Sequence, residues 1–220
     1  MSGAPSGPET LVREVLHGLA EGRYAPGQRL VEPDLMARSG LGRSSVREGL
    51  GRLAALGVVD LVPHRGATIR LLTRRAARDV LRVTERLLGL AARQAAEAVA
   101  AGADAGPLAQ AAGEYDRAPT SGARGRFYRA LTALGGNAEL DRLLPSLQVH
   151  LIRAQLRDAR PAGMGARAAV VAAVRAGDPA RAEAAAIAYV QALLAALDGV
   201  PDSAFAPDQG RIITLPALRA

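Results

Sequence analysis

Apolar residues recur at helical spacing in a short stretch within the first third of the chain. From Arg43 to Leu53 the sequence reads RSSVREGLGRL, and a helix entered at Arg43 places one apolar stripe on one side, formed by Val46, Leu50, Leu53 and Gly57. Arg43, Ser44 and Arg47 project from the first turns, away from that stripe. The pattern predicts a helix with one buried face and one arginine-bearing end.

Shorter elements flank this helix in a defined order. Pro33 to Arg38 is expected to form a short helix before a Ser39-Gly40 turn. On the other side, Val58 to Val62 and Ala67 to Leu71 form a two-strand pattern around the turn Pro63-His64-Arg65-Gly66. Helix, turn, helix and ribbon is the order of a winged helix-turn-helix, in which the second helix enters the DNA major groove.

The segment before these elements predicts one more helix and one short strand. Glu9 to Glu21 carries a single apolar face, formed by Leu11, Val15, Leu16 and Leu19. Arg29 to Val31 is expected to add a strand to the sheet of the wing. Residues 1–8 are small and contain Pro and Gly, so they are expected to be disordered.

After Leu72 the pattern becomes purely helical. Thr73 is a suitable N-cap for a long helix that ends near Ala101. Further helices are expected at residues 108–116, 124–134, 137–159, 166–176 and 179–197. The predicted fold is mainly α, with an N-terminal winged helix-turn-helix in residues 9–72 and an all-helical bundle domain in residues 73–198. Residues 199–220 are expected to be a tail that contains, at most, a late strand at Arg211 to Leu215.

Composition narrows the class of protein. The 220 residues exceed what one small winged-helix unit needs, which favours a second domain. The chain has no cysteine, which excludes disulfides, thiolate metal sites and cysteine nucleophiles. The N-terminus lacks the features of a signal peptide, and the apolar stretch at residues 184–197 is shorter than the roughly 20 residues that span a bilayer. The protein is expected to be soluble and cytoplasmic.

The formal charge of +7 suggests an anionic partner, but its distribution is uninformative. Residues 1–72 carry nine arginines against seven acidic residues, whereas residues 73–220 carry nineteen against fourteen. The excess therefore does not concentrate in the predicted DNA-binding part. The placement of individual arginines is more informative than the net charge.

Several motifs resemble those of one bacterial protein family. The stretches GRYAPGQRL from Gly22, RSSVREGLGRLAALGVV from Arg43 and PHRGATI from Pro63 resemble the signature of the GntR family of transcription regulators. In the helical part, RFYRALTALGGNAEL from Arg126 and VAAVRAGDPARAEAAAIAYV from Val171 resemble the FCD effector-binding domain of the FadR-type subfamily. The resemblance implies a homodimer that binds a palindromic double-stranded DNA operator and responds to a small organic acid or related metabolite.

The resemblance assigns DNA-binding roles residue by residue. It places the recognition helix and the wing tip on Arg43, Ser44, Ser45, Arg47, His64, Arg65 and Gly66. Guanidinium groups suit this role because their planar fork can bond bidentately to guanine. Pro33 stands where many members have another arginine, and Gly42 stands where a Ser or Thr usually caps the recognition helix, so fewer DNA contacts are expected. Gly49 and Gly51 each cost that helix about 1 kcal/mol relative to Ala.

Many FCD domains hold a divalent metal with one Asp and three His. In this chain the corresponding positions are Arg124, Tyr128, Arg167 and Tyr189. The only histidines are His17, His64 and His150, and one of these falls in the helical domain, so a three-histidine site within one protomer is excluded by count. No metal cofactor is therefore expected.

Replacement of these ligands suggests two alternatives for the helical domain. Two guanidinium groups facing one cavity repel a cation, so we expect Arg124 and Arg167 either to bind an anionic effector, with hydroxyl hydrogen bonds from Tyr128 and Tyr189, or to pair with local acids. In the other interpretation Arg124 points to solvent and the tyrosines only fill space. His150 is a further candidate for the lining of an effector pocket.

These observations predict a sequence-specific transcription regulator, with repression as the expected outcome. No nucleophile elbow, histidine cluster or phosphate-binding loop indicates an enzyme. The alternative is a regulator whose helical domain only dimerises and binds no ligand. Neither interpretation identifies the effector or the operator sequence.

Overall fold

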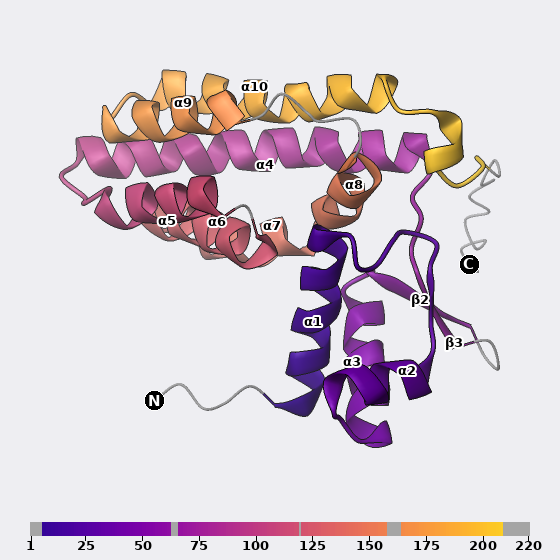
Figure 1. Cartoon of the computed structure of the whole chain (residues 1–220). Coiled ribbons are helices and arrows are strands. Elements are labelled where there is room, and N and C mark those ends of the chain that lie inside the picture. The colour runs from indigo at the N-terminus through magenta and orange to yellow at the C-terminus, as the bar shows by residue number, and fades with distance from the viewer. Residues whose placement is uncertain (1–5, 63–65, 119, 158–163, 209–220) are drawn as a thin grey trace, which may run out of the picture.

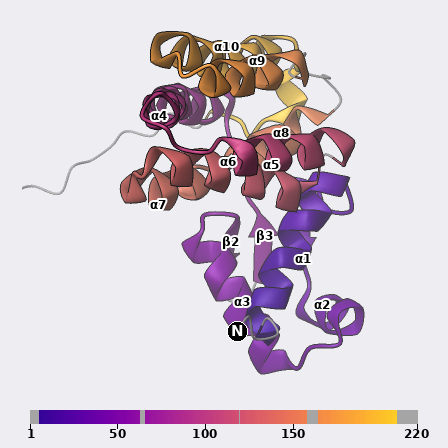
Figure 2. The same cartoon turned by 90° about the vertical axis from the view of Figure 1, so that its left-hand side faces the viewer.

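The computed structural model describes residues 6–62, 66–118, 120–157 and 164–208. A small domain of three helices and a sheet lies beneath a larger helical domain (Figure 1). In the view from the side, α9 and α10 form one layer, α4 the next, and α5 to α8 a third layer that faces the small domain (Figure 2). The prediction of a mainly α chain with an N-terminal winged helix is confirmed.

The small domain contains the predicted elements in the predicted order. They are α1 (Gly7–Glu21), β1 (Arg29–Leu30), α2 (Glu32–Ser39), α3 (Arg43–Ala55), β2 (Val59–Val62) and β3 (Gly66–Ile69). The sheet has the order β1-β3-β2 with antiparallel pairs, and Thr68 lies opposite both Arg29 and Asp60. The stripe of α3 packs on α1 as expected, with Val46 and Leu53 fully buried.

One glycine of α3 has a packing role that the sequence did not suggest. A Cβ atom at Gly49 would lie 2.8 Å from Leu11 Cδ2, so the absence of a side chain lets α1 and α3 approach closely. Gly51 faces open space and has no comparable partner among the described residues. The helix-propensity cost at Gly49 is therefore offset by closer packing, whereas the cost at Gly51 is not.

The helical domain is organised around its longest helix. The elements are α4 (Arg74–Ala100), α5 (Gly106–Arg117), α6 (Ser121–Gly135), α7 (Ala138–Ser146), α8 (Val149–Gln155), α9 (Met164–Arg175) and α10 (Pro179–Asp198). The hydroxyl of Thr73 accepts a hydrogen bond from the Ala76 amide, and the Asp178 side chain accepts one from the Arg181 amide, so both predicted N-caps are confirmed. Small residues on α4 permit close packing by α9 and α10, among them the buried Ala91, Ala92, Ala95 and Ala96.

The prediction of one continuous helix over residues 137–159 is wrong. The segment forms α7 and α8, because the chain becomes extended at Leu147, where ψ is 127°. Pro145 lies in the last turn of α7 and supplies no amide hydrogen to continue the helix. The break turns α8 towards α1, which positions it between the two domains (Figure 1).

Both ends of the described chain are more ordered than expected. Gly7 and Pro8 belong to α1, which starts after a capping box between Ser6 and Glu9. At the other end, Asp202–Ala204 forms a short 3-10 helix, and the buried Phe205 ring lies 4.4 Å from the Arg74 guanidinium. Residues 199–208 therefore pack on the start of α4. The possible strand at Arg211 to Leu215 lies outside the described residues.

Within the described ranges, one helix is long and apolar enough to cross a membrane. It is α10, with 20 residues, so the expectation that its apolar run is too short is corrected. Ala182, Ala186 and Val190 of this helix are fully buried against the rest of the bundle. These contacts place one face of α10 in the core of the helical domain.

Candidate functional site

The exposed end of α3 carries the predicted DNA-reading side chains. Gly42 is its N-cap residue and provides no side-chain hydrogen bond, so the first turn is left uncapped as the sequence indicated. Arg43, Ser44 and Arg47 are exposed. Ser45 is half-buried and turned inward, since a Cβ at Gly7 of α1 would lie 3.0 Å from its hydroxyl oxygen. Three of the four predicted α3 residues are thus accessible to a DNA duplex.

An acidic residue of α2 engages one of these arginines. The Arg47 Nε donates to both carboxylate oxygens of Glu32, at 3.1 and 3.2 Å. Arg47 nevertheless keeps 65% of its side chain exposed, so a phosphate or a guanine can compete for its guanidinium. Arg43 forms no ion pair with any residue in the described ranges. Its charge is available without displacing a protein partner.

The wing is described in part. Gly66 starts β3 with a φ of +82°, a conformation that glycine adopts readily and other residues rarely do. His64 and Arg65, which the family resemblance assigns to DNA contact, lie outside the described residues. The ribbon itself lies beside α3, with β2 and β3 paired from Val59–Ile69 to Val62–Gly66.

The four positions that the resemblance aligns with metal ligands do not all line one cavity. Arg167 is only 5% exposed; its guanidinium pairs with Asp116 of α5 and lies 4.0 Å from the Tyr115 ring centre. It does not line the cavity that contains Arg124 and Tyr128. Arg167 therefore ties α9 to α5, and joint binding of an anion by Arg124 and Arg167 is not supported by the geometry.

The pairing of Arg167 leads to a stability prediction. Asp116→Asn is expected to lower the free energy of unfolding by about 2 kcal/mol, because a buried guanidinium loses its counter-charge while the half-exposed aspartate leaves some solvent screening. Arg167→Met, which replaces the charge with an apolar chain of similar length, should change stability by less than about 1 kcal/mol. Urea denaturation measures both. Asp79→Asn, in the exposed Arg75–Asp79 pair, is the matched control; equal losses in the two Asp→Asn variants would contradict the structural role.

Tyr189 is also buried away from the cavity lining. Its hydroxyl lies 3.5 Å from that of Tyr128 and accepts a hydrogen bond from Arg153 of α8. Burial raises the pKa of Tyr189 well above its usual value, so the hydroxyl stays neutral. Tyr128 connects this buried group to the cavity, which it lines.

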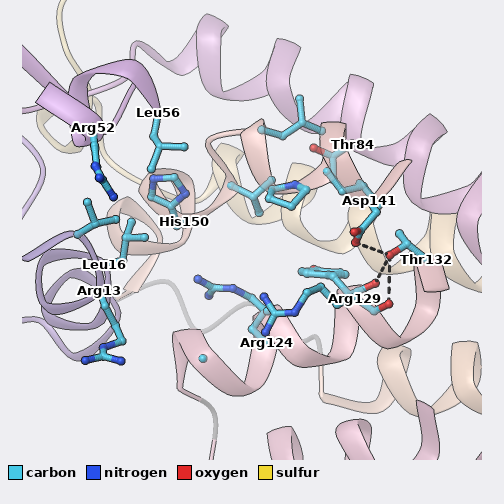
Figure 3. A pocket seen from close by; sticks show the side chains of 18 of the residues that line it. Arg13, Leu16, Arg52, Leu56, Thr84, Arg124, Arg129, Thr132, Asp141 and His150 are labelled. Atoms are coloured by element: carbon cyan, nitrogen blue, oxygen red, sulfur yellow. Dashed lines mark hydrogen bonds between the residues drawn. The ribbon is translucent and has the colours of Figure 1, made fainter. Parts of the chain in front are cut away.

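A cavity of about 740 Å³ lies between the two domains. The winged-helix domain contributes residues of α1 and the end of α3, and the helical domain contributes residues of α4, α6, α7 and α8. Figure 3 shows Leu16, Leu56 and Arg52 on one side, Thr84 and Asp141 at the other end, and Arg124 and Arg129 between them. Apolar side chains supply much of the wall, namely Val12, Leu16, Ala55, Leu56, Leu144, Pro145, Leu147 and Val149.

The charged groups of the cavity leave a positive excess on α6. Arg52 is paired with Glu48 and Glu9, at 2.8 and 3.4 Å, and Asp141 accepts a hydrogen bond from Thr132 at 2.9 Å. Arg124 and Arg129 line the cavity, and neither forms an ion pair with a residue that the structure describes. A cavity with two such guanidinium groups favours an anion.

The imidazole of His150 is a further polar group of the cavity lining, and the positive charge of Arg124 acts on it. Burial, and then the positive charge of Arg124, lower the pKa of His150 to about 4, so its ring is neutral near pH 7. Its Nε2 atom is buried without a hydrogen-bond partner in the described protein. An unsatisfied buried nitrogen in a cavity wall is a position where a ligand atom gains a hydrogen bond.

The described residues contain no group of three His, Asp or Glu side chains arranged to hold a metal ion. Sequence reasoning identified Arg124, Tyr128 and His150 but missed Arg129 and the contribution of the winged-helix domain. The assignment of Leu16 to the single buried face of α1 is wrong, because Leu16 lies half-buried with Val12 on a second face that lines the cavity. Val12, next to the predicted stripe, was the available signal.

Comparisons with known proteins agree with this architecture. Residues 9–69 match the model of bacterial regulatory proteins of the gntR family, and residues 69–192 match the FCD domain. A protein of Paenarthrobacter nicotinovorans, described as a "probable D-xylose utilization operon transcriptional repressor", is 30% identical over 189 residues, which cover 81% of this chain and 83% of the relative.

Two solved structures share this fold. A GntR transcriptional regulator from Rhodococcus sp. RHA1 superposes with a TM-score of 0.72 at 23% identity, and McbR/YncC of E. coli superposes with 0.74 at 20% identity. Each alignment covers 89% of this chain and 99% of the other. The matched models, the relative and the winged-helix architecture agree. The chain therefore belongs to the gntR family of bacterial DNA-binding transcription regulators and carries an FCD domain as its second part.

Proposed function

We propose that this protein is a repressor that binds a palindromic operator as a homodimer and is controlled by a small organic anion bound without a metal. Repression is the activity named for the Paenarthrobacter relative. DNA binding is supported by the exposure of Arg43, Ser44 and Arg47 at the start of α3, because guanidinium groups bind both base edges and phosphates. The proposed place of action is the cytoplasm.

Dimerisation is supported by an exposed apolar pair on α4. Val83 and Leu90 are 49% and 39% exposed and lie two turns apart on one face of the helix. A second copy of the chain would cover this face, and the two-fold symmetry would match a palindromic site. Sedimentation of the purified protein measures the oligomeric state directly.

The observation that carries the effector proposal is the composition of the cavity. Arg124 and Arg129 have no acidic partner in the described ranges, and the buried Nε2 of His150 lacks a hydrogen bond. Two cationic groups and one neutral imidazole fit an organic anion better than a divalent cation. The volume is within the range of small-molecule sites.

Two experiments test the two halves of the proposal. Selection of bound duplexes from a random DNA library should enrich one palindromic sequence; failure to enrich any sequence would exclude the DNA-reading role. In thermal-shift measurements, an organic carboxylate that binds the native state should raise the melting temperature by mass action, and Arg124→Gln should remove that rise. Zn²⁺ or Mn²⁺ binding at micromolar strength would instead overturn the metal-free assignment.

The alternative, a helical domain that only dimerises, is favoured by the same α4 face. It differs in one measurable respect. A dimerisation domain without a ligand site should give no thermal shift with any carboxylate, while still binding the selected operator.

A further inference from the structure

Both domains contribute side chains to the lining of the cavity, so a molecule bound there contacts both. We infer that the effector is an amphipathic organic anion, a carboxylate or sulfonate with an apolar body, and that it bridges the winged-helix and helical domains. The inference rests on the proposed function, because it concerns the same cavity. It adds that the DNA-binding domain itself forms part of the effector site.

The winged-helix domain contributes an apolar wall. On α1, Leu11 and Val15 are fully buried in the domain's own core, while Val12 and Leu16 are half-buried on a second face that lines the cavity. Leu56, the C-cap residue of α3, also lines it and is 42% exposed. An exposed leucine beside a second apolar helix face is a surface that an apolar ligand covers favourably.

The helical domain contributes two guanidinium groups and an imidazole to the cavity, and Arg13 of α1 adds a guanidinium from the winged-helix domain. Arg124 and Arg129 lie on α6, and His150 lies on α8 with its Nε2 unsatisfied. Figure 3 shows these arginines across the cavity from Leu16 and Leu56. A ligand that contacts these arginines as well as Leu16 and Leu56 therefore needs an anionic group and an apolar body. A compact polyanion such as citrate would leave the apolar lining of both domains uncovered.

Hydrogen bonds from α8, the helix that carries His150, and from a residue just after it connect the helical domain to the winged-helix domain. The Gln155 side chain of α8 donates to the Leu72 carbonyl at 3.1 Å and accepts from the Leu72 amide at 3.3 Å, at the start of the linker to α4. Arg157, just after α8, donates to the Leu19 carbonyl at the end of α1. A bridging ligand adds a third attachment between the domains.

This attachment explains how a ligand bound in the cavity would change the affinity of the dimer for its operator. The spacing of two α3 helices in a dimer must match the half-sites of the DNA. A ligand that holds each winged-helix domain against its helical domain changes the spacings that are accessible. By linkage, DNA and ligand then alter each other's affinity by the same factor.

The test uses 1-anilinonaphthalene-8-sulfonate as the probe, with the full-length protein. This probe is an amphipathic anion that fluoresces in apolar surroundings, and the chain contains no tryptophan to interfere. Arg124→Gln should weaken probe binding about tenfold through loss of a charge-assisted hydrogen bond. Leu56→Ser, on the other domain, should weaken it about fivefold through loss of apolar contact.

A matched control is available on the same domain. Leu61 is 50% exposed on β2 and does not line the cavity, so Leu61→Ser should leave probe affinity unchanged. Circular dichroism checks that each variant remains folded. Amide hydrogen exchange adds an independent readout, since the probe should slow exchange in α1 as well as in α6 and α8.

The possible outcomes separate the two proposals. If Arg124→Gln weakens binding while Leu56→Ser behaves like Leu61→Ser, and protection stays within the helical domain, the effector site stands but the bridging inference is overturned. If the native protein does not bind the probe, or Arg124→Gln leaves binding unchanged, the proposed effector site itself fails. Tighter binding of citrate than of the probe would contradict the amphipathic ligand class.

Discussion

Replacing Arg43 and Arg47 together with alanine is expected to weaken operator binding about a hundredfold or more. Each guanidinium is exposed at the start of α3, and a bidentate contact to a guanine contributes about 1–3 kcal/mol of discrimination. Loss of two positive charges near the phosphates should also make binding less dependent on salt. Fluorescence anisotropy of a labelled duplex carrying the selected operator, at two salt concentrations, measures both effects.

The matched control for this double variant is Arg75→Ala. Arg75 is 80% exposed on α4, so its loss removes a positive charge outside the proposed DNA-reading surface. Folding should be unaffected in all these variants, because surface substitutions usually change stability by less than about 0.5 kcal/mol. If the double variant binds operator as tightly as Arg75→Ala, α3 is not the reading helix.

Glu32→Gln provides the opposite change at the same surface. The Glu32 carboxylate holds Arg47 at 3.1 Å and places a negative charge near the expected DNA backbone. Its neutralisation should strengthen operator binding by about threefold to tenfold, in line with the free energy of an exposed ion pair and of one added phosphate contact. Weaker binding would instead show that Glu32 positions Arg47 for DNA.

The sequence was sufficient to predict most helices, because their apolar periodicity and caps are local. The Thr73 and Asp178 caps and the stripe of α3 are examples. The break between α7 and α8 was missed, since a single Pro145 near a helix end is compatible with either a stop or a kink. Local pattern alone does not determine which of the two occurs.

The candidate site was harder to predict because it depends on contacts between distant segments. Arg167 pairs with Asp116, 51 positions earlier, and neither residue carries a local signal of that pairing. The cavity wall from α1 likewise exists only because α8 turns back onto the first domain. The family resemblance aligned both Arg124 and Arg167 with metal ligands of one site. In the structure Arg124 lines the cavity, whereas Arg167 is buried beside Asp116.

The four positions that the resemblance aligns with metal ligands have three different kinds of surroundings. One arginine is neutralised by Asp116, the two tyrosine hydroxyls lie together beside Arg153, and Arg124 remains on the cavity wall. Arg124 and Arg129 thus place two positive charges on the cavity wall. An anion can interact with Arg124 and Arg129 directly, without a bridging cation.

Acidification is expected to destabilise the protein through His150 before the carboxylates titrate. The pKa of His150 is lowered from 6.5 to about 4 in the folded state, first by burial and then by Arg124. Above pH 6.5 the ring is neutral in both folded and unfolded chains, and the full stability is present. Between pH 6.5 and 4 the unfolded chain takes up a proton that the folded chain does not, so stability falls with pH by roughly 3 kcal/mol in total.

Urea denaturation at a series of pH values, in parallel for the native chain and His150→Gln, isolates this effect. The variant should lose much less stability between pH 6.5 and 4, since glutamine does not titrate. His17 remains in both proteins, as do Glu9 and Glu114, whose pKa values are lowered by hydrogen bonds from the Ser6 backbone and from Arg126. Their contributions therefore cancel in the comparison. If the free energy of unfolding changes with pH in the same way for both proteins, His150 is solvated or already charged. It would then not act as a neutral hydrogen-bonding group in the cavity wall.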